Sequence, residues 1–132
     1  MKITADTNVL IRAVVRDDER QARAADRILK SSEIIAVTLP TLCEFVWVLS
    51  RLYEFDRKDI AGAIRELADT ANVNLNRPAV EAGLATLNQG GDFADGLIAY
   101  EGNWLGAEAF VSFDKRAIRI LARQGYETRL LT

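Results

Sequence analysis

Short apolar runs that suit β-strands alternate with longer segments of helical periodicity along this 132-residue chain. The strand candidates are residues 2–6, 34–37, 73–75, 109–113 and 127–131. Continuous β-branched runs such as Ile34-Ile35-Ala36-Val37 suit a parallel sheet that is covered on both faces. The alternation predicts an α/β fold, a three-layer α/β/α sandwich with a mostly parallel central sheet. No linker or repeat interrupts it, so we expect a single domain over residues 1–132.

The composition excludes several kinds of catalyst. The chain has no histidine, which excludes Ser-His-Asp and Cys-His mechanisms and His-ligated zinc. The single cysteine, Cys43, cannot form an internal disulfide, and we interpret it as a small core residue because no histidine is present to activate it. No apolar run approaches the roughly 20 residues needed to span a bilayer, and no signal peptide is evident. We therefore expect a cytoplasmic protein that relies on carboxylates, with a metal ion as the obvious aid.

Four acidic residues occupy comparable places in the predicted elements. Asp6 and Asp114 each end a predicted strand and precede a helix, and Asp95 lies in the first turn of a helix after a glycine pair. Glu44 lies near the start of a helix that is otherwise apolar, where a charge needs a partner or a cation. If the strands are parallel, Asp6 and Asp114 project into the crevice where open α/β sheets bind ligands.

Each acid also has an ordinary structural interpretation. The three aspartates could cap their own helices, worth around 1 kcal/mol each, and Glu44 could pair with Arg51. Asp92 is the better cap for the helix after Gly91, while Thr7 or Asn8 is expected to open the first helix. Taken singly, the structural interpretation is favoured for each acid. Taken together, a shared site explains them better.

Carboxylates that share a pocket repel one another, and a divalent cation removes that conflict. Hard oxygen ligands without His or Cys select Mg²⁺, with Mn²⁺ as a plausible substitute. The chemistry most often served by such a site is metal-assisted hydrolysis of a phosphodiester.

The order and spacing of four motifs give the chain a specific resemblance to a known family. The motifs are Ile3-Thr4-Ala5-Asp6-Thr7-Asn8-Val9-Leu10, Leu42-Cys43-Glu44-Phe45, Asp92-Phe93-Ala94-Asp95-Gly96-Leu97-Ile98-Ala99 and Ser112-Phe113-Asp114-Lys115-Arg116-Ala117. Over its whole length the chain resembles a PIN-domain ribonuclease, most closely the VapC-type toxins of type II toxin–antitoxin pairs. Gly96 departs from the pattern, because the family commonly has Ala there. We expect this glycine to have little effect on the chemistry.

The resemblance implies a Mg²⁺-dependent endoribonuclease that cuts a defined RNA loop, such as one in tRNA or rRNA. It also implies a homodimer and inhibition by a cognate antitoxin protein. By match to the motifs, Asp6, Glu44, Asp95 and Asp114 would form the catalytic metal site. Asn8 and Ser112 would support it, with Ser112 standing where the family often has Thr, and Asp92 would be a further acid nearby.

Basic and aromatic residues add candidates for binding. Arg12, Lys115, Arg116 and Arg119 could bind RNA phosphates, although the last three could equally form a solvated helix face. Tyr53 and Trp47 could line an antitoxin groove, but core packing is the favoured interpretation.

Two other functions remain open from sequence. One is a phosphoryl-transfer protein that uses Asp6 as phosphoacceptor. A haloacid-dehalogenase-like pattern would need an Asp where Asn8 stands, and a receiver-like fold would need paired acids that are not evident. The other is a non-catalytic domain that binds metal or RNA.

Overall fold

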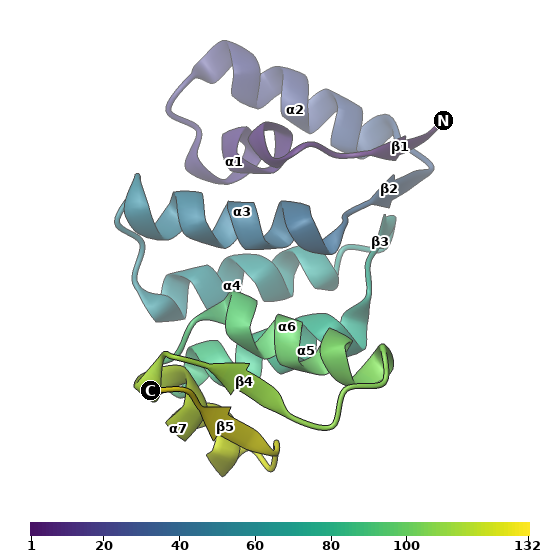
Figure 1. The fold of residues 1–132 in the computed structure, drawn as a ribbon. Helices are drawn as coiled ribbons and strands as arrows, with labels where there is room; N and C mark the ends of the chain where they lie inside the picture. The colour runs from purple at the N-terminus through teal and green to yellow at the C-terminus, as the bar shows by residue number, and fades with distance from the viewer. The chain divides into compact units, whose positions relative to one another are not determined.

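The computed structural model describes residues 1–132 and contains seven helices and five short strands (Figure 1). Every pair of adjacent strands is parallel, so the predicted α/β class with parallel strands is confirmed. The chain divides into two compact units, Met1–Asn76 and Arg77–Thr132, called below the first and second unit. No helix is both long enough and apolar enough to cross a membrane.

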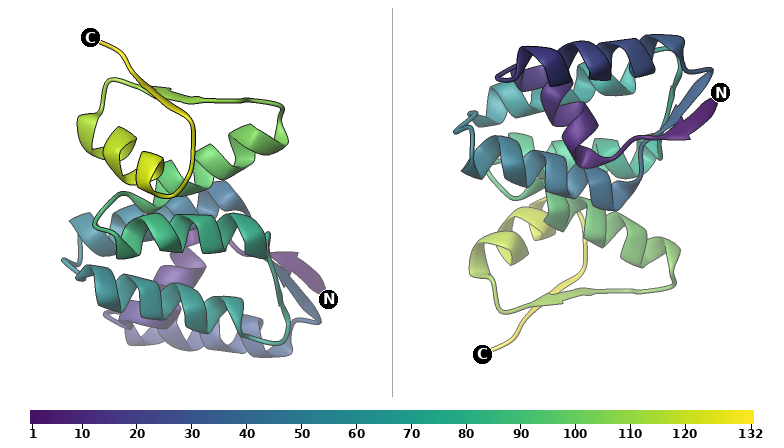
Figure 2. Two further views of the ribbon diagram at one scale, coloured as in Figure 1. Left: turned by 90° about the horizontal axis from the view of Figure 1, so that it is seen from below. Right: turned by 90° about the horizontal axis from the view of Figure 1, so that it is seen from above.

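The first unit contains a three-stranded parallel sheet in the order β1-β2-β3. Its elements are β1 (Lys2–Thr4), α1 (Thr7–Val15), α2 (Glu19–Ser31), β2 (Ile34–Ala36), α3 (Leu39–Arg51), α4 (Arg57–Ala68) and β3 (Val73–Asn74). In the central strand, Ile35 lies beside Ile3 on one side and Val73 on the other. Parallel neighbours need a crossover connection, and helices supply each of them here (Figure 2).

The core of the first unit is built from the apolar positions that recur at helical spacing. Leu10, Phe45, Leu49 and Ile64 are buried, and Ile35 is buried in the sheet. The helix α3 packs against both α1 and α4. Core packing was the favoured interpretation of Trp47 in this helix, and it is wrong, because Trp47 is 55% exposed.

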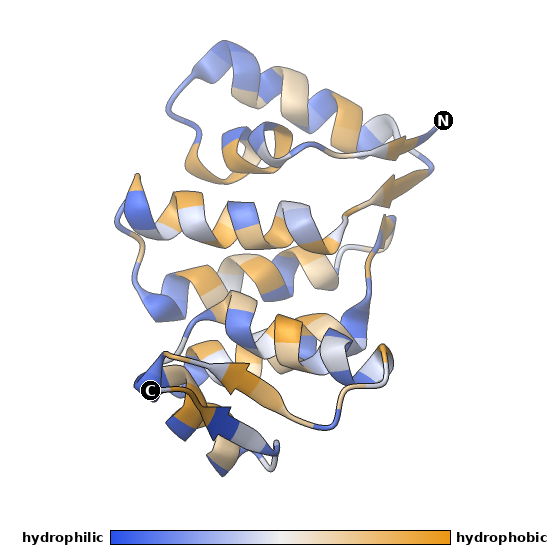
Figure 3. Cartoon of the chain, in the orientation of Figure 1, coloured by the Kyte–Doolittle hydropathy of each residue, from blue (hydrophilic) through white to orange (hydrophobic).

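The second unit begins with two closely packed helices and ends in a two-stranded parallel sheet. Its elements are α5 (Arg77–Asn88), α6 (Phe93–Trp104), β4 (Phe110–Ser112), α7 (Lys115–Arg123) and β5 (Thr128–Leu130). Val111 lies opposite Arg129 in the ladder, and α7 packs against both strands. Hydropathy colouring shows the apolar character of β2 and β4 that identified them as strands (Figure 3).

Glycines allow α5 and α6 to approach closely. A Cβ atom at Gly83 would lie 2.6 Å from the Phe93 ring, and one at Gly96 would lie 2.5 Å from the carbonyl oxygen of Ala82. Cβ atoms essentially never make contacts this short, so a side chain at either position would force its neighbours to move. Gly96 thus departs from the usual alanine for a packing reason that the sequence did not reveal.

The predicted first strand is too long, since it was expected to end at Asp6 and β1 ends at Thr4. The backbone N–H of Ala5 still donates to the carbonyl of Ala36 at 3.0 Å, after which the ladder stops. Asp6 retains an extended backbone but turns its carboxylate to the first helix, which ends the strand locally.

Candidate functional site

Asp6 is the N-cap of α1. One of its carboxylate oxygens accepts a hydrogen bond from the Thr7 N–H at 2.8 Å, and the other accepts none. The prediction that Thr7 or Asn8 would cap this helix is therefore wrong: Thr7 is buried, and Asn8 lies exposed in the first turn. The cap holds the Asp6 side chain in place and leaves one oxygen available for a ligand.

Glu44 lies in α3 and is exposed to solvent. The sequence suggested that a charge in this apolar helix would need a partner, but the structure contains no ion pair between Glu44 and Arg51. Exposure removes that need, because water can hydrate the carboxylate. Glu44 and Trp47 share the side of α3 that the core does not cover.

Asp114 is the N-cap of α7 and is held from both sides of the strand–helix junction. One carboxylate oxygen accepts hydrogen bonds from the N–H groups of Arg116 and Ala117, at 2.9 and 3.1 Å. The Ser112 hydroxyl accepts the N–H of Asp114 itself at 2.9 Å. Ser112 therefore fixes the backbone that carries the acid, and the second carboxylate oxygen of Asp114 accepts no hydrogen bond.

Asp92 and Asp95 lie at the start of α6. Asp92 is the N-cap, as expected, and accepts a hydrogen bond from the Ala94 N–H at 3.1 Å. Asp95 is half-buried and accepts no hydrogen bond. Burial, followed by repulsion from Asp92 and Asp114, raises the pKa of Asp95 from its ordinary value to about 6. Three acids of the second unit therefore act on one another electrostatically.

The structure thus brings together Asp92, Asp95 and Asp114 in the second unit, while Asp6 and Glu44 belong to the first. In neither unit do three acidic side chains come close enough to bind one metal ion. The donor chemistry nonetheless fits Mg²⁺ or Mn²⁺. The groups are hard carboxylate oxygens, and Asp95 bears a repulsion that a divalent cation would relieve.

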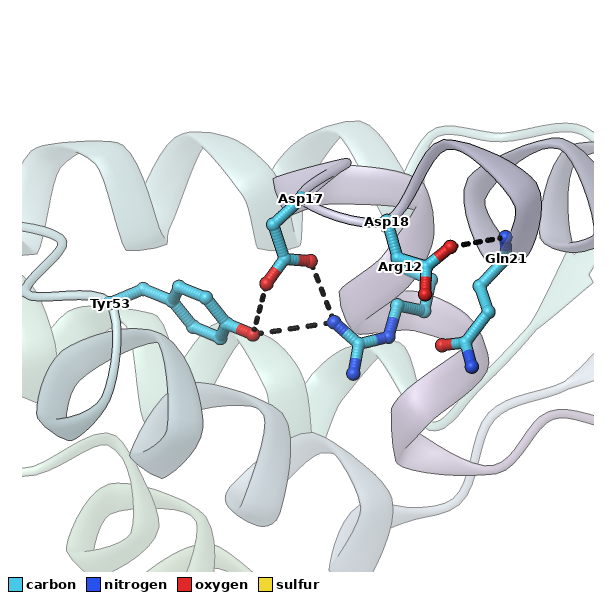
Figure 4. A network of polar contacts seen from close by, with 5 residues as sticks. All are labelled: Arg12, Asp17, Asp18, Gln21 and Tyr53. Carbon is cyan, nitrogen blue, oxygen red and sulfur yellow. Dashed lines mark hydrogen bonds and ion pairs between the residues drawn. The ribbon is translucent and has the colours of Figure 1, made fainter.

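Arg12 lies in a polar network that the sequence did not predict (Figure 4). Its guanidinium contacts the Asp17 carboxylate at 2.6 Å and the Tyr53 hydroxyl at 3.4 Å. The Tyr53 hydroxyl donates to the other Asp17 oxygen at 3.0 Å. These hydrogen bonds, first from Tyr53 and then from Arg12, lower the pKa of Asp17. Arg12 is therefore held within the first unit.

The sequence named Tyr53 as a groove or core residue and did not predict its contacts with Asp17 and Arg12. Asp17 is five residues from Arg12, so a local pairing of these two could be expected. Tyr53 lies just after the end of α3, and no local sequence pattern predicts its contact with Asp17. The Arg12 Nε–H is buried without a hydrogen-bond partner, so only part of the guanidinium is satisfied.

The cations of α7 are exposed. Lys115 and Arg116 directly follow Asp114, and Arg119 lies one turn further along the helix. None of the three forms an ion pair. The Arg116 guanidinium lies beside Gly90, where an added Cβ would be 3.2 Å away. Tyr100 and Trp104 meet on α6, where the indole N–H donates to the tyrosine hydroxyl at 2.8 Å.

Comparison with protein families places these observations in context. The PIN domain model matches residues 3–123 of the chain. The chain belongs to the PIN-domain family. The matched residues include every candidate acid from Asp6 to Asp114. PIN domains are generally metal-dependent nucleases, so the match indicates a nuclease that acts on nucleic acid. A search of curated proteins found no match to this PIN domain.

Proposed function

We propose that the chain is a Mg²⁺-dependent endoribonuclease that acts in the cytoplasm as the toxin of a toxin–antitoxin pair. The PIN-domain match over residues 3–123 carries the nuclease part of this proposal. The resemblance of its four acidic motifs to VapC-type toxins supports RNA as the substrate. The same resemblance supports a homodimer, a cognate antitoxin as inhibitor, and a loop of tRNA or rRNA as the target.

The proposed metal ligands are Asp6, Glu44, Asp95 and Asp114. Two features of the structure support them. Asp6 and Asp114 each use one oxygen as a helix cap and keep the second available. Asp95 carries a pKa that is raised first by burial and then by the neighbouring Asp92 and Asp114, and a divalent cation would stabilise its ionised form. When bound, Mg²⁺ would polarise the scissile phosphate and promote ionisation of the attacking water.

The residues around these acids have defined tasks in the proposal. Ser112 and the N-terminal amides of α7 orient Asp114, and Asp92 adds negative charge beside Asp95. Asn8 is a neutral group beside Asp6 that can orient a carboxylate or a water molecule without adding charge. Lys115, Arg116 and Arg119 follow Asp114 and would hold RNA phosphates near the scissile bond. Arg12 is a weaker candidate for this task, because Asp17 already occupies its guanidinium.

The test is cleavage of RNA by the purified chain. We expect endonucleolytic products with Mg²⁺ or Mn²⁺, none with EDTA, and a loss of at least 100-fold in rate for Asp95→Asn and for Asp6→Asn. Asp56→Asn is the matched control, because Asp56 is also a helix N-cap and Asn can replace it there. Sequencing the ends of the products would identify the target loop.

Three results would contradict the proposal. Cleavage that persists in both Asp95→Asn and Asp6→Asn would show that the site is misassigned. Binding of RNA without cleavage under every metal tested would favour a binding domain. Acid-labile phosphate on Asp6 after incubation with a small phosphodonor would favour phosphoryl transfer.

A further inference from the structure

The helix α2 carries a row of four basic residues outside the candidate site. Arg20, Arg23, Arg27 and Lys30 are all exposed, and they follow one another at intervals of three, four and three residues. At 3.6 residues per turn, this spacing places them within roughly 80° of the helix circumference and along about 15 Å of its axis. We call these four residues the α2 stripe.

The α2 stripe points away from the core. Ala22 and Ala25, on the opposite side of the helix, are buried. The helix also carries two acids, Glu19 and Asp26. Asp26 is engaged by Arg16, whose guanidinium contacts its two carboxylate oxygens at 3.0 and 3.1 Å. Glu19 is exposed beside Arg20 and forms no ion pair, so the stripe keeps an excess of positive charge. The Asp18 side chain caps the helix by accepting the Gln21 N–H at 3.1 Å. The helix is therefore held at its start and along its side, and the stripe lies on a fixed surface.

None of the four cations has an acidic partner in the structure. Like charges three or four residues apart destabilise a helix, and ordinary solvated helices alternate the sign of their charges. The chain as a whole has a net charge of −2, so the stripe is a local excess of positive charge in an acidic protein. Unpaired and aligned, these charges are best explained by a ligand that carries repeated negative charges.

We propose that the α2 stripe binds the phosphate backbone of the RNA, outside the site of cleavage; this inference rests on the proposed ribonuclease function. Ile28, the one large apolar side chain exposed on α2, lies at least about 80° around the helix from the stripe at about 100° per residue, whereas a protein partner would be expected to bury an apolar centre. Figure 3 shows the hydrophilic residues recurring along α2. Binding through charge alone is sequence-independent, so the stripe would hold a long RNA while other residues select the bond that is cut.

The test is the salt dependence of RNA binding by the full chain. The anisotropy of a fluorescent 30-nucleotide RNA would be measured in EDTA over a range of KCl concentrations. For Arg23→Gln/Arg27→Gln we expect at least tenfold weaker binding at low salt. We also expect the slope of log K against log salt to fall in magnitude by about 1.4, at about 0.7 per phosphate contact on a single strand. The Lys pair Arg23→Lys/Arg27→Lys should restore the slope, because charge is what matters.

The matched control is Arg51→Gln/Lys58→Gln, which removes the same charge from exposed positions of the first unit outside the stripe. It should leave the slope unchanged. A stripe variant that binds RNA with the same salt slope as the unaltered chain would overturn the inference. If that variant had also lost binding to a polyglutamate peptide, the stripe would instead be a binding surface for an acidic protein partner.

Cleavage by the unaltered chain separates the two proposals. If that chain cuts RNA with Mg²⁺ and the stripe variant binds RNA normally, the stripe inference alone fails. If the unaltered chain neither binds nor cuts RNA, the proposed function fails and the stripe inference fails with it.

Discussion

At the scale of single residues, Asp95 shows most directly how burial and nearby acids change the pKa of a carboxyl group in the second unit. Its carboxylate is half-buried, accepts no hydrogen bond and is repelled by Asp92 and Asp114. Burial first, and then repulsion from the two acids, favours the protonated form, which is why its pKa rises to about 6. The folded chain therefore binds a proton at Asp95 more readily than the unfolded chain does, and the ionised form is destabilising.

The sign of this effect sets a pH dependence for Asp95→Asn in metal-free protein. Between the unfolded pKa near 3.8 and the folded value of about 6, the folded state holds more protons, so stability falls as pH rises. The variant cannot ionise and should be more stable than the unaltered chain at pH 7, by about 1 kcal/mol because solvent screens the half-buried charge. The gain should vanish at pH 4. Urea titrations in EDTA at the two pH values would measure it, and equal gains at both would contradict the assignment.

Asp114 allows the structural and chemical roles of one carboxylate to be separated. Asp114→Asn retains an oxygen that can accept the N–H groups of Arg116 and Ala117, so it should change stability by less than about 0.5 kcal/mol. Asp114→Ala loses the cap and should cost about 1 kcal/mol. Both should abolish RNA cleavage if Asp114 is a metal ligand. Thermal unfolding and a cleavage assay on the same samples would check this, and an active Asn variant would reduce Asp114 to a cap.

At the scale of elements, the contact between α5 and α6 governs where Asp92 and Asp95 lie. Both acids are at the start of α6, and at this end of the helix the Phe93 ring lies against Gly83 of α5. Thr86, which is fully buried in α5, lies directly against Gly96 and donates to the Gln124 side-chain oxygen at 3.1 Å. A change in the spacing of the two helices would therefore move the acids.

Gly96→Ala should be destabilising although alanine is the better helix former. Its Cβ would meet the Ala82 carbonyl and the Thr86 side chain, and overpacking of this kind costs about 1–3 kcal/mol. Gly62→Ala in α4 is the matched control, because its Cβ would enter open space and should stabilise by about 0.5–1 kcal/mol. Urea denaturation would measure both. A neutral Gly96→Ala would show that the helices separate easily.

At the scale of the whole molecule, a metal ion would act on the stability of the chain by mass action. The proposed ligands Asp6 and Glu44 come from the first unit, and Asp95 and Asp114 come from the second. A ligand that binds only the folded state at about 100 times its Kd adds about 2.7 kcal/mol to the free energy of unfolding.

We therefore expect Mg²⁺ or Mn²⁺ to raise the melting temperature of the unaltered chain, and Asp6→Asn and Asp95→Asn each to reduce that rise. Differential scanning calorimetry with and without metal would measure it, with Asp56→Asn as the control. A rise that is lost in Asp95→Asn but kept in Asp6→Asn would confine the metal to the second unit.

Local signals made much of the fold predictable. Asp92 and Asp114 stand before apolar periodic segments and cap the helices that they were expected to cap. The strand around Ile35 follows from a β-branched run, and the strand around Val111 follows from a short run with two aromatic residues. Asp6 caps α1, as its ordinary structural interpretation predicted, because its carboxylate accepts the Thr7 amide left free at the helix start. The end of the preceding strand was predicted less well, since β1 ends at Thr4 and not at Asp6.

The candidate site was predictable to a smaller extent. The acids that matter to the proposal could be named from their motifs, and the PIN-domain match confirms the family. The protonation state of Asp95 could not be predicted, because its pKa depends on burial and on two acids, Asp92 and Asp114, that act on it in the folded chain. The network of Arg12, Asp17 and Tyr53 was equally hidden, since a hydroxyl 36 residues from Asp17 completes it.

The sequence alone determined the alternation of strands and helices, the absence of histidine chemistry and the positions of the acidic motifs. These depend on residue type and on neighbours within a few positions, where periodicity and capping act. Tertiary structure decided that Asp95 resists ionisation, that an added Cβ at Gly96 would crowd α5 and that Arg12 is already engaged. Burial, close packing and charge–charge distance are properties of segments that meet only after folding, so no local pattern encodes them.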